Sequence, residues 1–238
     1  SAASDVYKRQ IFWSIMTRIN FNIVRVFCLF IFAAILICSA ESAAREAVIE
    51  SVIDGDTIRV DKRKKVRLIG IDAPEIYDGK KLQWESRKLR LSHEDIKILG
   101  NKSKSFLEKI LETAKGRGLI LLRYDRNYVF NGHRDKYGRI LSYIYVPVDE
   151  DTRNKKNWVY ENINGKYYIF INATMLKEGY ALVYYYGKFE KIEEFLSYEE
   201  DARLNKRGLW NVEKGYSFVW DRILEMRNRC INFSIRKL

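Results

Sequence analysis

The stretch "VIDGDTIRV" places two aspartates, Asp54 and Asp56, one residue apart among residues that otherwise favour a β-strand. Aspartate is depleted in strands and common in turns, so Asp54 followed by Gly55 indicates a tight turn between two strands. Aspartates at positions i and i+2 of an extended chain also project from the same face, which suits a hard cation such as calcium. These nine residues leave both interpretations open.

A third aspartate follows another strand-like run. The run "VRLIGID" is rich in aliphatic residues, and Asp72 closes it. Calcium binds several carboxylate oxygens, and Asp54, Asp56 and Asp72 could supply them from neighbouring strand ends. The three aspartates therefore form a candidate cation site.

Two arginines and a glutamate accompany these aspartates. Arg67 stands near the start of "VRLIGID", and Arg139 follows the turn "DKYG". Both suit a phosphate group, because the guanidinium fork matches phosphate oxygens and keeps its charge. Glu75 directly follows Pro74 and is a candidate to activate water. The alternative is that Arg67 and Glu75 form an ordinary surface ion pair, which contributes little to stability.

The elements that must position these residues are mainly strands. Residues 47–71 predict strand, turn, strand, turn and strand, with the charged "DKRKK" at a hairpin tip. The runs "LILLRYD" and "RILSYIYV" predict buried strands. A further hairpin is predicted from "WVYENI" and "KYYIFI", because Asn164 and Gly165 between them are the preferred pair for a type I′ turn.

Helices are predicted later in the chain. Apolar residues at helical spacing predict a helix from Phe106 to Ala114, which Gly116 closes. Asn172 is a good N-cap for a short helix "ATMLKE", and a longer helix follows over 189–206. Residues 76–100 are charged and weakly patterned, which predicts a surface loop with room for a short helix at "WESRKLRL". The fold class is α+β, a small antiparallel barrel with packed helices.

The chain has 238 residues, enough for one domain with extensions. It holds 43 Lys and Arg residues against 31 Asp and Glu residues, and the charges are spread along the sequence. This balance favours a polyanion as partner, although an ordinary soluble basic surface is the alternative.

The N-terminal part resembles a targeting segment. Residues 1–15 precede the first methionine and are set aside as extraneous. Residues 16–44 show a basic start, an apolar run over 26–38 and then small residues, the pattern of a secretory signal peptide. A bilayer span needs roughly 20 residues, so this shorter run favours secretion to the cell envelope or beyond. A membrane anchor through the same run is the alternative.

The cysteines exclude two kinds of stabilisation. Cys28 and Cys38 lie within the signal, so a cleaved chain keeps only Cys230. We therefore expect no intramolecular disulfide, and the lack of a Cys/His cluster argues against structural zinc.

Five segments occur in a characteristic order: "VIDGDTIRV", "VRLIGIDAPE", "DKYGRILSYIYV", "INATMLKEGYALVYYY" and "EEDARLNKRGLW". Together they resemble the secreted staphylococcal-type nucleases, also called thermonucleases. The resemblance implies a five-stranded oligonucleotide-binding (OB) barrel with three helices over residues 45–212. Residues 213–238 lie outside it, as a C-terminal extension that is either a packed helix or an amphipathic arm.

The resemblance also implies which residues bind calcium. The family's ligands fall on Asp56 and Asp72, with Asp54 nearby in support and the backbone carbonyl of Ala73 as a further ligand. The family's best-known form has threonine where this chain has Ala73, and a main-chain ligand survives that change.

Further roles carry over to the charged residues around this cluster. The phosphate-binding arginines fall on Arg67 and Arg139, and the proposed general base falls on Glu75. Three more positions match residues that contact the nucleotide: Lys136, Tyr137 and Tyr185. Aromatic residues also favour strands, so Tyr137 and the run 184–186 could instead be core or edge-strand residues.

The implied activity is calcium-dependent hydrolysis of phosphodiester bonds in DNA and RNA, with little sequence specificity. Single-stranded nucleic acid is the expected substrate, and the chain is expected to act as a monomer. Two segments, 76–100 and 147–159, are longer than is usual in the family and could reshape access to the site. The alternative function is a non-catalytic nucleic-acid-binding module of the same fold.

Overall fold

The computed structural model describes residues 25–26, 29, 44–113, 118–184 and 186–211. The chain divides into two compact units, residues 1–43 and residues 44–238. In the first unit Arg25, Val26 and Leu29 are described, and all three are helical. The predicted signal peptide therefore lies almost wholly outside the described residues, and the predicted extension 213–238 lies entirely outside them. None of the helices in the described ranges is both long and apolar enough to cross a membrane.

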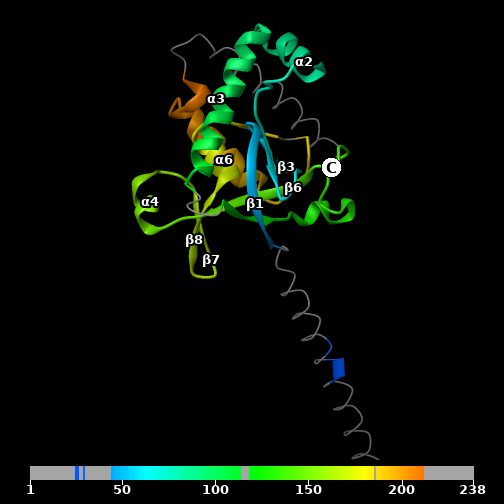
Figure 1. Cartoon of the computed structure of the whole chain (residues 1–238), viewed down its shortest axis with the longest axis vertical. Coiled ribbons are helices and arrows are strands. Elements are labelled where there is room, and N and C mark those ends of the chain that lie inside the picture. Colours follow the sequence, from blue (N-terminus) through cyan, green and yellow to red (C-terminus); the bar gives the residue numbers. More distant parts are fainter. Residues whose placement is uncertain (1–24, 27–28, 30–43, 114–117, 185, 212–238) are drawn as a thin grey trace, which may run out of the picture. The chain divides into compact units, whose positions relative to one another are not determined.

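The second unit contains a closed five-stranded barrel (Figure 1). Its strands are β1 (Ala44–Asp54), β2 (Thr57–Val60), β3 (Lys64–Leu68), β5 (Leu119–Arg123) and β6 (Ile140–Pro147). β1 pairs with β2 and β5, β2 pairs with β3, and β5 pairs with β6, all antiparallel. A parallel pairing of β3 with β6 closes the barrel. The predicted α+β barrel is thus confirmed.

Shorter strands extend this framework. They are β4 (Ile71–Asp72), β7 (Tyr160–Ile163), β8 (Lys166–Phe170) and β9 (Leu182–Val183). β4 pairs with β9, and β8 pairs with both β6 and β7. At the predicted type I′ turn, Asn164 and Gly165 have φ values of 52° and 80°, so this hairpin prediction is also confirmed.

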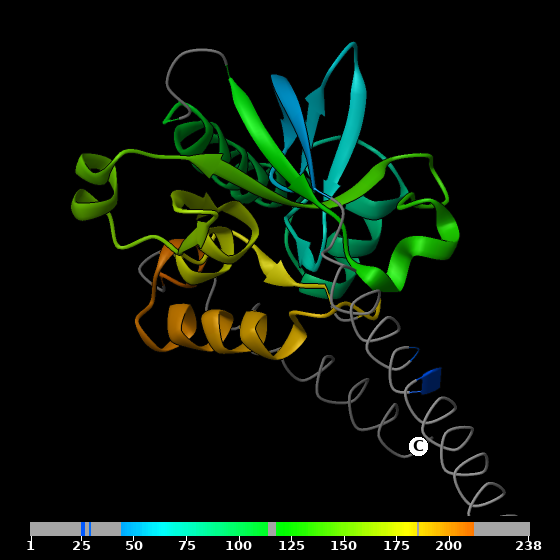
Figure 2. The ribbon, with the colours of Figure 1, turned by 90° about the horizontal axis from the view of Figure 1, so that it is seen from below.

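Several helices surround the barrel. They are α2 (Lys80–Leu89), α3 (His93–Leu111), α4 (Glu150–Lys155), α5 (Ile171–Lys177) and α6 (Ile192–Leu204), with 3₁₀ turns η1 (Arg126–Asn131) and η2 (Gly208–Trp210). α5 contacts both β6 and α6 and lies between them (Figure 2). Phe170 and Phe195, both fully buried, join these layers in one apolar core.

The prediction for residues 76–100 is right only in part: the short helix expected at "WESRKLRL" is present as α2, which begins earlier, at Lys80, whereas the predicted loop around it includes the first half of α3. The apolar residues of this segment are few but spaced for helices: Leu82 and Leu89 are buried on α2, and Ile96 and Leu99 are buried on α3. The high charge of the segment lies largely on the opposite faces. Helix α3 also begins well before the predicted start at Phe106.

Asn172 is not the N-cap that the sequence predicts. It lies inside α5, and its side chain is fully buried. Its Oδ1 accepts a hydrogen bond of 3.0 Å from the backbone N–H of Ile144, and its Nδ2 donates one of 2.8 Å to the carbonyl oxygen of Ile69. The amide therefore joins α5 to β6 and to the segment between β3 and β4.

Asn172→Ala is expected to lower the free energy of unfolding by about 2 kcal/mol, because two buried backbone groups lose their partner. Urea denaturation measures this change. Asn101→Ala is the matched control, since Asn101 is exposed and its side chain bonds only to the carbonyl of Lys97 in the same helix. An equal effect of the two substitutions would contradict the bridging role.

Candidate active site

The turn between β1 and β2 carries both aspartates of the opening stretch. Asp54 Oδ1 accepts a hydrogen bond of 3.1 Å from the backbone N–H of Asp56, so Asp54 caps its own turn. A Cβ on Gly55 would lie 2.6 Å from the Cβ atoms of both Ala73 and Ser103. Only glycine allows this close approach to α3, and the approach seats Asp56 in the interior.

Asp56 is 3% exposed and fully engaged by the protein. Its Oδ2 accepts a hydrogen bond of 2.9 Å from the backbone N–H of Ala73, and its Oδ1 accepts one of 2.9 Å from the hydroxyl of Thr57. Oδ1 also pairs with the guanidinium of Arg67. Asp56 thereby connects β2, β3 and the segment that follows β4.

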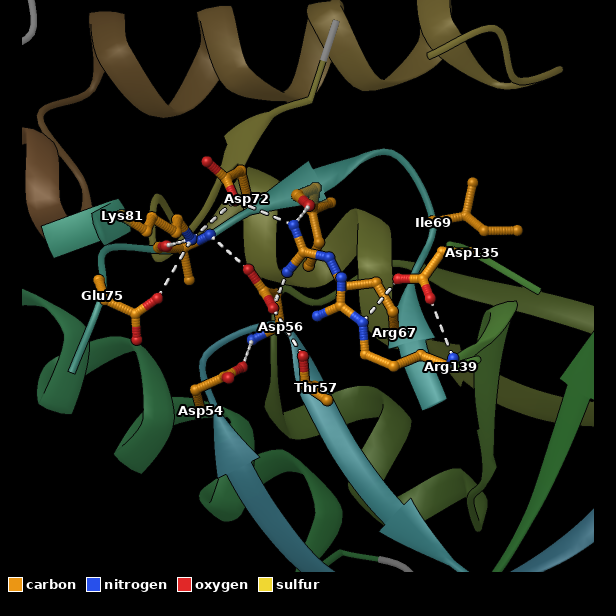
Figure 3. A network of polar contacts seen from close by, with 12 residues as sticks. Asp54, Asp56, Thr57, Arg67, Ile69, Asp72, Glu75, Lys81, Asp135 and Arg139 are labelled. Atoms are coloured by element: carbon orange, nitrogen blue, oxygen red, sulfur yellow. Dashed lines mark hydrogen bonds and ion pairs between the residues drawn. The ribbon is translucent and has the colours of Figure 1, made fainter. Parts of the chain in front are cut away.

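Arg67 projects from β3 between two aspartates (Figure 3). Its Nη1 pairs with Asp56, while its Nη2 donates hydrogen bonds of 2.9 Å to Asp72 Oδ1 and 3.0 Å to the carbonyl oxygen of Ile71. The side chain of Arg67 is 12% exposed. The predicted phosphate-binding arginine and the two predicted calcium ligands are therefore bound to one another.

Glu75 lies at the start of the connection to α2. Its Oε1 accepts hydrogen bonds of 3.0 Å and 3.1 Å from the backbone N–H groups of Ile76 and Tyr77. Its own backbone N–H donates a hydrogen bond of 3.0 Å to Oε2 of Glu85 on α2. Helix α2 thus fixes the backbone of the candidate base through Glu85.

Lys81, also on α2, lies among the acidic side chains (Figure 3). Its Nζ is 3.2 Å from both Asp72 Oδ1 and the carbonyl oxygen of Ala73, 3.7 Å from Glu85 Oε1 and 3.9 Å from Glu75 Oε2. The side chain of Lys81 is 40% exposed, whereas that of Glu85 is 7% exposed.

Burial and charge act in opposite directions on these acids. Burial opposes ionisation of Asp72, but the charges of Lys81 and Arg67 outweigh it and hold the pKa of Asp72 below its ordinary value. Burial raises the pKa of Glu85 to about 7, although Lys81 opposes this. Burial also raises the pKa of Asp54, against the nearby charge of Arg67. The two cations therefore favour the ionised form most clearly at Asp72.

Arg139, just before β6, lies at the same group of charged residues as Arg67. Its Nε donates a hydrogen bond of 2.7 Å to Asp135 Oδ2, and its backbone N–H donates one of 3.0 Å to Asp135 Oδ1. Burial of Asp135 is outweighed by these bonds, so the pKa of Asp135 lies below its ordinary value. Figure 3 shows the guanidinium groups of Arg67 and Arg139 pointing toward one another.

A cavity of about 850 Å³ opens over these residues. Lys136 and Tyr137 lie at its wall, where Lys136 Nζ is 5.1 Å and Arg139 Cζ is 5.5 Å from the centre of the Tyr137 ring. Tyr137 is 72% exposed, so it is neither a core nor a strand residue. Four more aromatic side chains line the cavity: Trp84, Tyr128, Tyr184 and Tyr186.

Most of the predicted site residues come together in this cavity. Its lining includes the following predicted residues: Asp56, Arg67, Asp72, Glu75, Lys136, Tyr137 and Arg139. Asp54 and Ala73 are not part of this lining; Asp54 Oδ1 caps its own turn, and Tyr185 lies outside the described residues. Lys81, Trp84 and Glu85 were missed, although the i, i+4 spacing of Lys81 and Glu85 is a helical pairing signal.

The donor atoms suit a hard cation. The Asp56 and Asp72 carboxylates and the Ala73 carbonyl supply oxygen only, which is what calcium prefers. The ammonium of Lys81 already contacts two of these three groups as a cation. Within the described ranges, however, no three His, Cys, Asp or Glu side chains are grouped closely enough to hold a metal ion. The chemistry of the site fits calcium, while its oxygens are bound by Arg67 and Lys81.

Gly100 in α3 keeps the segment of Glu75 in place. A Cβ on Gly100 would lie 2.5 Å from Ile76 Cγ2 and 2.6 Å from the carbonyl oxygen of Pro74. Gly100→Ala is expected to displace this segment by about 1 Å and to lower the rate of any reaction that depends on Glu75 by up to about 100-fold.

The helix itself should survive this change, because alanine favours helix formation over glycine by about 1 kcal/mol. Circular dichroism measures the helix content, and an assay of the reaction at the cavity measures the displacement. Ser105→Ala, at an exposed position of α3, is the control. An unchanged rate in Gly100→Ala would contradict the proposed positioning.

The fold is an OB-type barrel with α+β layers. The acidic and arginine side chains gathered at its cavity form a candidate hydrolytic site. The family model described as "Staphylococcal nuclease homologue" matches residues 65–212, more than half of the chain. The chain belongs to this family.

Individual relatives agree with this assignment. "Uncharacterized protein MJ1439" of Methanocaldococcus jannaschii is 34% identical over 167 residues, which are 67% of this chain and 69% of that protein. The thermonuclease of Staphylococcus intermedius is 26% identical over 176 residues, 72% of this chain and 80% of its own. Endonuclease YhcR of Bacillus subtilis is 24% identical over 175 residues, 70% of this chain, and the match spans 11% of its length.

Proposed function

We propose that this protein is a calcium-dependent nuclease that hydrolyses phosphodiester bonds in DNA and RNA with little sequence specificity. The observation that carries the proposal is the convergence of Asp56, Arg67, Asp72 and Arg139 on one cavity. The names of two relatives, a thermonuclease and an endonuclease, support it at 26% and 24% identity.

Asp56, Asp72 and the carbonyl of Ala73 would hold the calcium ion. When bound, calcium supplies positive charge that lowers the cost of the additional negative charge on the phosphate. Asp56 is positioned for this by its bond from the Ala73 backbone, which brings a carboxylate and a carbonyl of the donor set to adjacent places. The buried turn at Gly55 makes that placement rigid.

The two arginines bind the phosphate group. Arg139 uses its Nε to bind Asp135, which orients the guanidinium toward Arg67 and leaves its two Nη groups to donate to phosphate oxygens. Arg67 binds substrate by exchanging carboxylate oxygens for phosphate oxygens. Both groups stabilise the negative charge that develops as water attacks the phosphorus.

Glu75 orients the attacking water. One of its oxygens is occupied by the backbone N–H groups of Ile76 and Tyr77, so the other is the oxygen that faces the reaction. The hydrogen bond from its backbone N–H to Glu85 holds the main chain of Glu75 in place. As the water adds to phosphorus, it gives a proton to the free oxygen of Glu75. The bond to the 5′-oxygen breaks, and this oxygen takes a proton from solvent and leaves as a 5′-hydroxyl, which leaves a 3′-phosphate on the other product.

The cavity wall favours single-stranded substrate. Tyr137, Tyr184 and Trp84 are partly exposed aromatic residues on which unpaired bases can stack. Such stacking ignores sequence because every base has an aromatic face. The excess of basic residues attracts the phosphate backbone, so binding should weaken as salt rises.

We place this activity outside the cytoplasm, in the cell envelope or the medium, because residues 16–44 have the pattern of a signal peptide. The alternative is a chain that remains anchored through residues 26–38. Expression in a secreting host followed by mass spectrometry of the released protein distinguishes the two, since cleavage near Ala40 or Ala44 removes the apolar run.

Cleavage of heat-denatured DNA and of RNA by the purified protein tests the proposal. We expect degradation with CaCl₂, none with excess chelator, and loss of activity in Asp56→Ala. Asp78→Ala is the control, because Asp78 is 80% exposed and pairs with Lys97 away from the cavity. Circular dichroism of each variant checks the fold. Binding without cleavage under every metal tried would instead indicate a non-catalytic binding module.

A further inference from the structure

The acidic site already contains a cation of its own. The ammonium of Lys81 lies 3.2 Å from Asp72 Oδ1 and 3.2 Å from the carbonyl oxygen of Ala73 (Figure 3). Glu85 and Glu75 place further carboxylate oxygens at 3.7 Å and 3.9 Å. The ammonium thus occupies carboxylate and carbonyl oxygens of the kind that a hard divalent cation also needs.

Helix α2 fixes the position of this ammonium. Leu82 and Leu89 are buried and anchor the helix, while Glu85 follows Lys81 by one turn and faces it. The side chain of Lys81 is nevertheless 40% exposed, so ions from solvent can reach it. Lys80, the preceding residue, is exposed and does not line the cavity, so the arrangement is specific to one lysine of the pair.

An ammonium and a divalent ion exclude each other here. Like charges repel strongly at such short range, and a divalent ion doubles the repulsion that a monovalent one would meet. Both cations need the oxygens of Asp72 and Ala73. Lys81 must therefore move away, toward solvent, before a divalent ion can bind there.

We infer that the ammonium of Lys81 is a built-in counter-ion of the acidic site. Without metal it holds the oxygens of Asp72 and Ala73 together, and it is displaced when a divalent cation binds. The inference rests on the proposed function, which places the cation at Asp72 and Ala73. Removing the ammonium should strengthen binding of the divalent ion, because a competitor for its oxygens is lost. It should also make the protein depend more on that ion for stability.

The test compares the full-length wild type, Lys81→Met and Lys81→Arg, with Lys80→Met as the matched control. Each chelator-treated protein is titrated with CaCl₂ by isothermal titration calorimetry, and thermal denaturation is followed with and without CaCl₂. We expect Lys81→Met to bind calcium about 5- to 10-fold more tightly and to gain more from CaCl₂ in melting temperature. Lys81→Arg keeps the charge, so it and Lys80→Met should stay within about twofold of wild type.

The outcomes separate this inference from the proposed function. Equal or weaker calcium binding by a folded Lys81→Met overturns the inference, as does an absence of calcium binding by every variant. If Lys81→Met binds calcium no more tightly than wild type, yet the wild type cleaves DNA in a calcium-dependent manner, the proposed function stands and the inference fails. Tighter calcium binding by Lys81→Met, with no cleavage of DNA by any variant, supports the counter-ion role of Lys81 and overturns the proposed nuclease function. Circular dichroism identifies a variant that fails to fold, and in that case Lys81→Gln replaces Lys81→Met.

Discussion

Arg67→Ala is expected to lower the rate of cleavage of denatured DNA by at least about 100-fold. Removal of a single preorganised donor to a charged transition state costs about 100- to 1000-fold in other enzymes. Arg67 is better placed than an exposed arginine to have this effect, because its side chain is 12% exposed and directed by two aspartates. Initial rates at saturating substrate, compared with binding of the same DNA, would show the loss mainly in turnover.

Arg67→Lys should recover little of this activity. The two Nη groups of Arg67 serve different partners, Asp56 on one side and Asp72 with the Ile71 carbonyl on the other. A single ammonium cannot span both sides, so charge alone does not replace the guanidinium fork.

The control is Arg87→Ala, because Arg87 is exposed on α2 and its Nε bonds only to the carbonyl of Gln83. This variant removes the same charge from the protein without touching the cavity. Nearly wild-type turnover in a folded Arg67→Ala, or an equal loss in Arg87→Ala, would contradict the assigned role of Arg67.

The sequence predicts the barrel well because the barrel depends on local patterns. Aliphatic strands alternate with strong turn signals, and Asn164 followed by Gly165 determines a hairpin almost alone. The same alternation explains why Asp56, Arg67 and Asp72 were found. They stand at the ends of neighbouring strands, so correct strand assignments bring them together without any knowledge of distant contacts.

What the sequence does not predict depends on tertiary contacts. Asn172 resembles an N-cap, yet its amide is used by β6 and by Ile69. Gly100 resembles the end of a loop, yet it lies inside α3, where the segment of Glu75 approaches too closely for any side chain. Local preference was overridden in both cases by a partner far along the chain.

The charged face of α2 is what the sequence does not predict at the site, although a short helix is expected at "WESRKLRL". Its charged residues look solvated, because a sequence pattern cannot show that Lys81 lines the cavity and that Glu85 contacts Lys81 and the backbone of Glu75. Only two apolar residues, Leu82 and Leu89, mark the buried face. A short helix with so few apolar residues gives a weak periodic signal, and its functional face is the one that carries charge.

Glu85 gives the stability of the protein a specific pH dependence. Burial raises its pKa from 4.5 to about 7 in the folded protein, so the folded state binds this proton more tightly than the unfolded state does. The associated stability is therefore fully present below pH 4.5 and is lost as pH rises toward 7. Glutamine at this position cannot ionise, yet its oxygen can still accept the hydrogen bond from the backbone of Glu75.

Glu85→Gln is accordingly expected to gain about 2 to 3 kcal/mol in unfolding free energy relative to wild type between pH 5 and pH 8. Urea denaturation in the presence of chelator measures this difference at each pH. Leu82→Val is the control, because Leu82 is fully buried on the same helix and cannot titrate, so its effect should be the same at both pH values. If the difference between wild type and Glu85→Gln did not change with pH, Glu85 would have to be ionised throughout, held in that form by Lys81 despite its burial.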